Sequence, residues 1–119
     1  MLQILIYPKC STCQKAVRWL NDKGIEYQVR NIVEESLSVL ELRNLHLKSK
    51  LPIKKFFNTS GIKYRELNLK DKISQLTDEE LYELLASDGM LVKRPLAYQL
   101  DLVTLGFKPL EYESMWLNS

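Results

Sequence analysis

A chain of 119 residues with 45% hydrophobic and 27% charged residues is long enough to bury a core, which excludes a disordered or fibrous protein. The net charge of +2 is too small to indicate a nucleic-acid-binding surface, so we expect no direct contact with nucleic acid. Two cysteines and one histidine cannot supply the four ligands of a structural zinc ion and do not form a disulfide-rich secreted scaffold, so no metal site is expected.

The apolar stretches, such as residues 2–7, are much shorter than a membrane-spanning helix, and the chain does not begin with a signal-peptide pattern. We therefore expect a soluble, cytoplasmic protein with no membrane partner. No segment has the length and polarity of a linker, so residues 1–119 are expected to form a single domain.

The first quarter of the chain predicts a strand, a helix and a second strand. Residues 2–7 are aliphatic and β-branched and end at Pro8. Residues 11–23 carry apolar side chains at helical spacing and are followed by Gly24, a helix stop signal. Residues 26–32 alternate as in a strand. This order implies a parallel strand pair joined by a right-handed crossover.

The middle of the chain, residues 34–88, is predicted to be mainly helical. A leucine-rich segment is followed by Pro52, which can begin a short helix, and by Thr77 with Glu80, which resemble a capping box. Residues 96–99 and 102–107 then predict a hairpin, and Pro109 begins a last helix that runs through residue 116. The predicted order is β-α-β, a helical block, then β-β-α.

Two cysteines, Cys10 and Cys13, lie three residues apart where the first strand meets the first helix. Side chains at this spacing share a helix face, so the two thiols can approach disulfide distance. Cys10 is expected at the helix N-cap, where free N–H groups and the helix dipole stabilise a thiolate, and Lys9 and Lys15 add positive potential. An inert buried pair is the alternative, but a CxxC between a strand and a helix favours redox chemistry.

A low thiol pKa alone gives little catalysis. Lowering the pKa from about 8.5 to about 6.5 raises the thiolate fraction at pH 7 roughly 25-fold. A thiolate of lower pKa is about eightfold less nucleophilic, so the net gain in the rate of attack is only about threefold. A useful enzyme must therefore also stabilise the transition state, which points to another cation near the sulfur.

Arg94 is the candidate for that cation. In a thioredoxin-like order of elements, a proline that opens a late strand falls in a cis-proline loop beside the active thiol, and Pro95 has this place. Arg94 would then bind an oxyanion bidentately, together with backbone N–H groups of Ser11 and Thr12 at the helix N-terminus. The alternative is an ion pair of Arg94 with a surface carboxylate such as Asp88.

The remaining polar and aromatic residues have simpler interpretations. His46 lies far in sequence from Cys10 and is expected on a helix surface. A basic run is expected to be solvated, with glutathione, a partner protein or nucleic acid as alternative ligands; it contains Lys48, Lys50, Lys54 and Lys55. Five aromatic residues are expected to pack in the core or half-buried: Trp19, Tyr64, Tyr82, Tyr112 and Trp116.

Three parts of the chain together resemble the ArsC-related arsenate reductase family, which includes the Spx-type transcriptional regulators. Residues 7–13 are similar to its thiol turn, residues 55–61 and 64–67 to its helical middle, and residues 91–96 to its Arg-Pro loop. The resemblance implies an α/β thioredoxin-like fold with a mixed four-stranded sheet and a helical insertion at about residues 34–88. It also implies that Cys10 is the nucleophile, that Arg94 binds the oxyanion and that the Arg94–Pro95 bond is cis.

For function, the resemblance implies a thiol-dependent oxidoreductase that reduces arsenate and holds no bound cofactor. In the glutaredoxin-linked reductases, glutathione and glutaredoxin complete the reaction. This chain has Asn58 and Lys108 where those enzymes carry two further anion-binding arginines, so these two residues are expected to be weaker oxyanion ligands. Cys13 can resolve an adduct or sulfenate on Cys10 as an intramolecular disulfide, which thioredoxin could then reduce.

Two alternatives remain open. The Spx-type regulators use a CxxC as a redox switch and bind RNA polymerase, but this chain ends at Ser119, without the longer basic tail expected of that type. A general thiol-disulfide oxidoreductase would act on disulfide substrates and not on a small oxyanion.

Overall fold

The structure, a computed structural model, describes residues 1–117. The chain divides into two compact units, which we describe separately. Unit 1 combines Met1–Asn31 with the C-terminal segment from Arg94 onward, and unit 2 is formed by Ile32–Lys93. Each unit has its own secondary structure, and the two thiols belong to unit 1.

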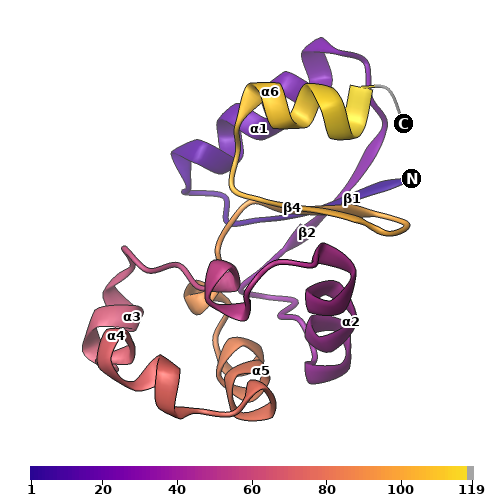
Figure 1. Cartoon of the computed structure of the whole chain (residues 1–119). Helices are drawn as coiled ribbons and strands as arrows, with labels where there is room; N and C mark the ends of the chain where they lie inside the picture. The colour runs from indigo at the N-terminus through magenta and orange to yellow at the C-terminus, as the bar shows by residue number, and fades with distance from the viewer. Residues whose placement is uncertain (118–119) are drawn as a thin grey trace. The chain divides into compact units, whose positions relative to one another are not determined.

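Unit 1 is built on a four-stranded mixed sheet with the strand order β2-β1-β3-β4 (Figure 1). Its strands are β1 (Leu2–Ile6), β2 (Tyr27–Asn31), β3 (Leu96–Gln99) and β4 (Leu102–Leu105). Strand β1 pairs in parallel with β2 and antiparallel with β3, and β3 pairs antiparallel with β4. The predicted α/β class, the parallel first pair and the late hairpin are confirmed.

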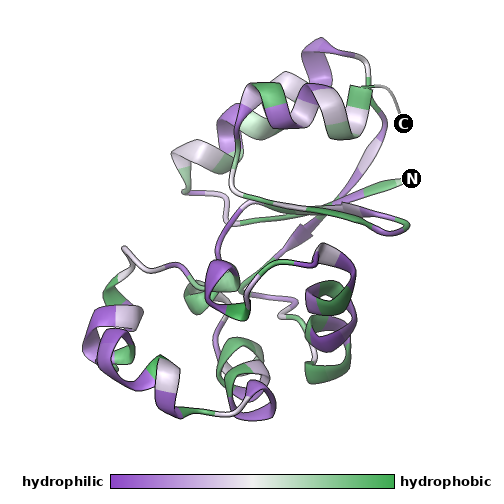
Figure 2. Ribbon diagram, viewed as in Figure 1, coloured by the Kyte–Doolittle hydropathy of each residue, from purple (hydrophilic) through white to green (hydrophobic). Residues whose placement is uncertain are grey.

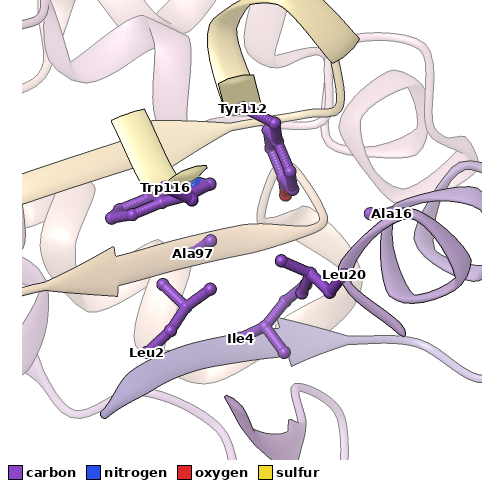
Figure 3. Packing of buried hydrophobic residues seen from close by; sticks show 7 residues of the cluster. All are labelled: Leu2, Ile4, Ala16, Leu20, Ala97, Tyr112 and Trp116. Atoms are coloured by element: carbon purple, nitrogen blue, oxygen red, sulfur yellow. The ribbon is translucent and has the colours of Figure 1, made fainter. Parts of the chain in front are cut away.

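Two helical segments cover the same face of this sheet. They are α1 (Ser11–Asp22) and α6 (Pro109–Tyr112), which continues as the π-helical segment η4 (Glu113–Leu117) (Figure 1). The predicted last helix is therefore present, but its winding widens after Tyr112. The core between helices and sheet contains Leu2, Ile4, Ala16, Leu20, Ala97, Tyr112 and Trp116 (Figure 3).

Helix α1 follows directly from its sequence. Cys13, Ala16 and Leu20 recur at three- and four-residue spacing, and all three are fully buried. The helix ends where predicted, because Gly24 adopts the left-handed conformation with φ of 67° and its N–H donates to the carbonyl of Asn21.

Unit 2 is helical, as predicted. Its α-helices are α2 (Val39–Ser49), α3 (Ile62–Glu66), α4 (Leu69–Lys72) and α5 (Asp78–Ser87), and its 3₁₀ segments are η1 (Ile53–Phe56), η2 (Ile73–Gln75) and η3 (Gly89–Leu91). Helices α2 and α5 pack together. Both carry hydrophilic and hydrophobic segments (Figure 2), as expected for helices that bury one face.

Capping residues set the beginnings of the two longer helices of unit 2. The capping box predicted at Thr77 and Glu80 is present, and a second one joins Ser38 to Glu41. Across residues 1–117, no helix has the length and apolar character needed to span a membrane.

Candidate functional site

The candidate site begins in the turn between β1 and α1. Cys10 is the N-cap of α1, with an extended backbone at φ −87° and ψ 116°. Its own N–H donates to the carbonyl of Tyr7 at 2.9 Å. Its sulfur accepts a hydrogen bond from the backbone N–H of Cys13 at 3.4 Å. Cys10 Sγ therefore takes the place that a serine or aspartate oxygen has in an ordinary N-cap.

The two thiols differ sharply in exposure. Cys10 is partly exposed, whereas Cys13 is fully buried on the core face of α1 with Ala16 and Leu20. Both thiols are free. A reagent or substrate that approaches from solvent therefore meets Cys10 first, because Cys13 has no exposed surface.

The pKa values of the two thiols are shifted in opposite directions, and that of Cys10 is lowered. Partial burial raises the pKa of Cys10, but hydrogen bonds from the side chain and backbone of Cys13, the charge of Arg94 and the backbone of Thr12 together lower it. The net pKa of Cys10 lies below that of an ordinary cysteine. The backbone at the helix N-terminus and the charge of Arg94 thus act on the sulfur as expected, whereas the causes of the shift do not include the charges of Lys9 and Lys15.

Cys13 shifts in the opposite direction. The pKa of Cys13 is raised to about 12: burial is the largest cause and the hydrogen bond and charge of Cys10 act in the same direction, while the backbone of Tyr7 and the charge of Arg94 lower it. Cys13 is therefore a protonated thiol at neutral pH. The pair consists of one thiolate-forming sulfur and one hydrogen-bond donor.

Arg94 lies on the loop that leads into β3. The Arg94–Pro95 peptide bond is cis, as the family resemblance implies. Pro95 is buried, and its carbonyl accepts a hydrogen bond from the N–H of Gly106 at 2.9 Å, which ties the loop to the end of β4. The guanidinium of Arg94 lies over the ring of Tyr7, with Cζ 5.5 Å from the ring centroid. The alternative partner, Asp88, forms an ion pair with Lys63 at 4.0 Å.

The other predicted oxyanion ligands have different surroundings. Ser11 and Thr12 are exposed in the first turn of α1, and Lys108 is exposed at the N-cap of α6 in the same unit. Asn58 belongs to unit 2, where its N–H donates to Leu91 O at 2.7 Å and its Oδ1 accepts from Ser60 at 3.4 Å. Oxyanion binding by all four residues remains a prediction.

Tyr7 is the residue of this site that sequence reasoning did not single out. Its carbonyl binds the Cys10 amide, and its ring lies under Arg94. The signal in the sequence is an aromatic residue that ends a strand three positions before the first cysteine. That signal gains meaning only when the sheet brings Arg94 opposite to it.

An open groove of about 510 Å³ lies beside the thiol turn. Pro8 and Gln14 line it and are joined by a 2.9 Å hydrogen bond from Gln14 Nε2 to the carbonyl of Pro8. The other lining residues come from β1 and the outer face of α1: Ile6, Val17, Arg18, Asn21 and Asp22.

Several residues singled out in the sequence lie outside the thiol turn. His46 lies on α2 and is partly exposed, as expected; its Nδ1 lies 2.6 Å from the hydroxyl of Tyr82, and its ring packs edge-on against Phe56. All four lysines of the basic run are exposed, as expected. The five aromatic residues are buried or half-buried, as predicted. The described residues hold no cluster of three or more His, Cys, Asp or Glu side chains that could bind a metal.

Comparison with known proteins agrees with this geometry. A model of the ArsC family matches residues 5–115. The uncharacterized protein YusI of Bacillus subtilis is 54% identical over 110 residues, which cover 92% of this chain and 93% of YusI. The global transcriptional regulator Spx 2 of Bacillus anthracis is 26% identical over 107 residues, which cover 90% of this chain and 80% of Spx 2.

Solved structures show the same fold. An ArsC family related protein from Bacteroides fragilis superposes with a TM-score of 0.92 at 50% identity, with 95% of each chain covered. An arsenate reductase from Vibrio cholerae superposes with a TM-score of 0.82 at 31% identity, with 96% of this chain and 98% of that chain covered. The fold, the thiol turn and the family match together establish that this chain belongs to the ArsC family and has its thioredoxin-like fold.

Proposed function

We propose that this protein is a thiol-dependent oxidoreductase of the arsenate reductase type, in which Cys10 is the nucleophile and Cys13 the resolving thiol. The observation that carries the proposal is the hydrogen bond from the Cys13 N–H to Cys10 Sγ, together with the opposite pKa shifts of the two thiols. One sulfur is thus prepared to attack, and the other keeps its proton until it is needed.

The first step is attack of the Cys10 thiolate on a small oxyanion. With arsenate, the sulfur bonds to arsenic and an oxygen leaves as water after protonation, which gives a Cys10–arsenic(V) adduct. Arg94 and the first-turn N–H groups of α1 would bind the oxyanion and stabilise charge that develops on its oxygens. This step requires no bound cofactor.

The second step is attack of Cys13 on the sulfur of Cys10. A Cys10–Cys13 disulfide forms, the bond to arsenic breaks, and the electron pair leaves with arsenic as arsenite. The two thiols lose two electrons and arsenic gains two, so the reaction balances. Capture of the Cys10 sulfur as an adduct removes the charge that helps raise the pKa of Cys13, so Cys13 ionises more readily after the first step.

The disulfide then needs an external reductant. Because the second thiol lies in the same chain, a dithiol protein such as thioredoxin suffices, and glutathione with glutaredoxin is the alternative reductant. The arsenate reductase of Vibrio cholerae, similar along 96% of this chain, supports an oxyanion as the substrate. Asn58 and Lys108, in place of arginines, weaken the case for arsenate itself.

Turnover of arsenate by the purified chain, coupled separately to a thioredoxin and to a glutaredoxin system, tests the proposal. We expect Cys10→Ser to abolish turnover in both systems. Cys13→Ser should abolish turnover in the thioredoxin system but not in the glutaredoxin system, because no disulfide can form within the chain. Wild-type turnover no faster than that of Cys10→Ser in both systems would overturn the assignment.

The alternative function is a redox-sensing regulator that binds RNA polymerase, favoured by the similarity to Spx 2 over 90% of this chain. In this case the same disulfide acts as a signal and not as an intermediate. Co-purification with RNA polymerase in one redox state would support this alternative, and its absence in both the oxidised and reduced states would exclude it. A general disulfide oxidoreductase would instead reduce insulin without any oxyanion.

A further inference from the structure

Tyr7 directly follows β1, and Arg94 lies two residues before β3, the strand that pairs with β1. Strands β1 and β3 pair antiparallel, with Gln3 opposite Tyr98 and Leu5 opposite Leu96. The same register, continued by two residues beyond the last observed pair, would set Tyr7 opposite Arg94. Side chains directly opposite each other on neighbouring strands are close enough to interact. The 5.5 Å distance from Arg94 Cζ to the Tyr7 ring centroid agrees with this placement.

The backbone at both ends of this contact is restricted. Tyr7 precedes Pro8 and Arg94 precedes Pro95, and a following proline limits the conformations of the residue before it. The Tyr7 carbonyl also accepts the hydrogen bond from the Cys10 amide at 2.9 Å. Tyr7 therefore connects the turn that holds the nucleophile with the loop that holds the cation.

A restrained guanidinium has a chemical advantage here. Arg94 is only partly buried, and a long arginine side chain at such a site loses considerable rotamer freedom when it binds an anion. The face of an aromatic ring attracts a guanidinium and restricts it before the anion arrives. Because the guanidinium is already restricted in the free enzyme, less conformational entropy is lost when it binds the anion in the transition state.

We propose that Tyr7 is a positioning residue, which holds the Arg94 guanidinium beside Cys10 through a cation–π contact. The proposal deepens the proposed function and rests on it for the role of Arg94 in oxyanion binding. The Tyr7 backbone bonds to the Cys10 amide and acts on the Cys13 thiol, but a substitution of the side chain keeps these backbone contacts. The effect of the Tyr7 side chain is therefore expected to act through Arg94.

The test uses two alkylating reagents and needs no turnover, so it is independent of whether arsenate is the substrate. Iodoacetate is an anion and iodoacetamide is neutral, so the ratio of their rate constants with Cys10 reports the positive charge beside the sulfur. We expect Tyr7→Leu to lower this ratio about two- to fivefold and to move the pH profile of alkylation upward. Tyr7→Phe keeps the ring and should behave like the wild type.

Two controls separate positioning from a structural role. Tyr98→Leu removes the half-buried aromatic residue at the other end of the same strand pair and should leave the ratio unchanged. In an Arg94→Met background, Tyr7→Leu should have no further effect on the ratio. Should Tyr7→Leu fail to fold, Tyr7→Met removes the ring in its place.

Three results would overturn the proposal. They are an unchanged ratio after loss of the Tyr7 ring, an equal change in Tyr7→Phe, and a full Tyr7→Leu effect in the Arg94→Met background. If the ratio behaves as expected while arsenate turnover is absent, the positioning role of Tyr7 stands and only the substrate assignment fails.

Discussion

The backbone N–H of Cys13 donates a hydrogen bond to the sulfur of Cys10 at 3.4 Å, so the second thiol residue helps to activate the first. The helix cap and the redox pair are thus the same structural feature. Replacement of either cysteine is therefore expected to change the pKa of the other, because each contributes to the pKa shift of its partner.

Removal of the Arg94 charge should raise the pKa of Cys10. The positive charge of Arg94 lowers that pKa, so in Arg94→Met a smaller fraction of Cys10 is thiolate at neutral pH. Thiolate absorbance at 240 nm, followed against pH, measures the shift. Lys9→Met, an exposed lysine next to Cys10, is the matched control and should shift the profile less. Equal shifts in the two variants would contradict a specific role for Arg94.

Cys13 should make the reduced protein less stable in alkali. Its pKa is raised in the folded state, so its contribution to stability is complete below the pKa of an unfolded cysteine and is lost as the pH rises toward about 12. Between about pH 8 and pH 10.5 the free energy of unfolding should fall by roughly 1 to 2 kcal/mol more in the wild type than in Cys13→Ala. Urea unfolding under reducing conditions at both pH values measures the difference, and parallel losses would refute it.

Gly89 has no room for a side chain. A Cβ atom at this position would overlap the carbonyl oxygen of Ile32, which is a backbone atom and cannot rotate away. Gly89→Ala should therefore destabilise the protein by about 1 to 3 kcal/mol or more. Gly61→Ala is the control, because the nearest atom there, at 2.7 Å, is the end of the Asn58 side chain. Thermal unfolding should show a clearly larger loss for Gly89→Ala.

Thr77 should contribute to stability as a helix cap. Its hydroxyl accepts a hydrogen bond from the Glu80 N–H at 3.2 Å, and the Glu80 carboxylate accepts one from the Thr77 N–H at 3.1 Å. Thr77→Ala should cost about 1 kcal/mol and lower the melting temperature by roughly 3 to 6 °C. Thr77→Ser keeps the cap and should remain near the wild type. A melting temperature of Thr77→Ala equal to that of Thr77→Ser would contradict this role.

Local signals in the sequence predicted the elements with strong physical causes. Gly24 marked the end of α1, Thr77 the beginning of α5, and Pro109 the beginning of α6, because each residue has a specific backbone conformation or hydrogen bond to supply. The two short helices α3 and α4 were not predicted individually, since four or five residues carry too little periodicity.

The site was predicted in part for the same reason. The place of Cys10 at the N-cap of α1 and the proximity of Cys13 follow from spacing within one turn, which is local information. The contact of Tyr7 with Arg94 depends on the register of two strands that are far apart in the chain, and sequence alone did not reveal it. Nor does sequence supply the pKa of Cys13, since its shift comes mainly from burial.

Unit 1 is formed by two segments that are separated in the sequence by the whole of unit 2, and this order matters during synthesis of the chain. The segment with β1, α1 and β2 leaves the ribosome first, but β3, which pairs with β1 at the centre of the sheet, follows only after all of unit 2. A nascent chain therefore displays the CxxC turn beside an unpaired strand edge and without its arginine. Both the completed sheet and the tuned thiol arise only when the last quarter of the chain has been translated.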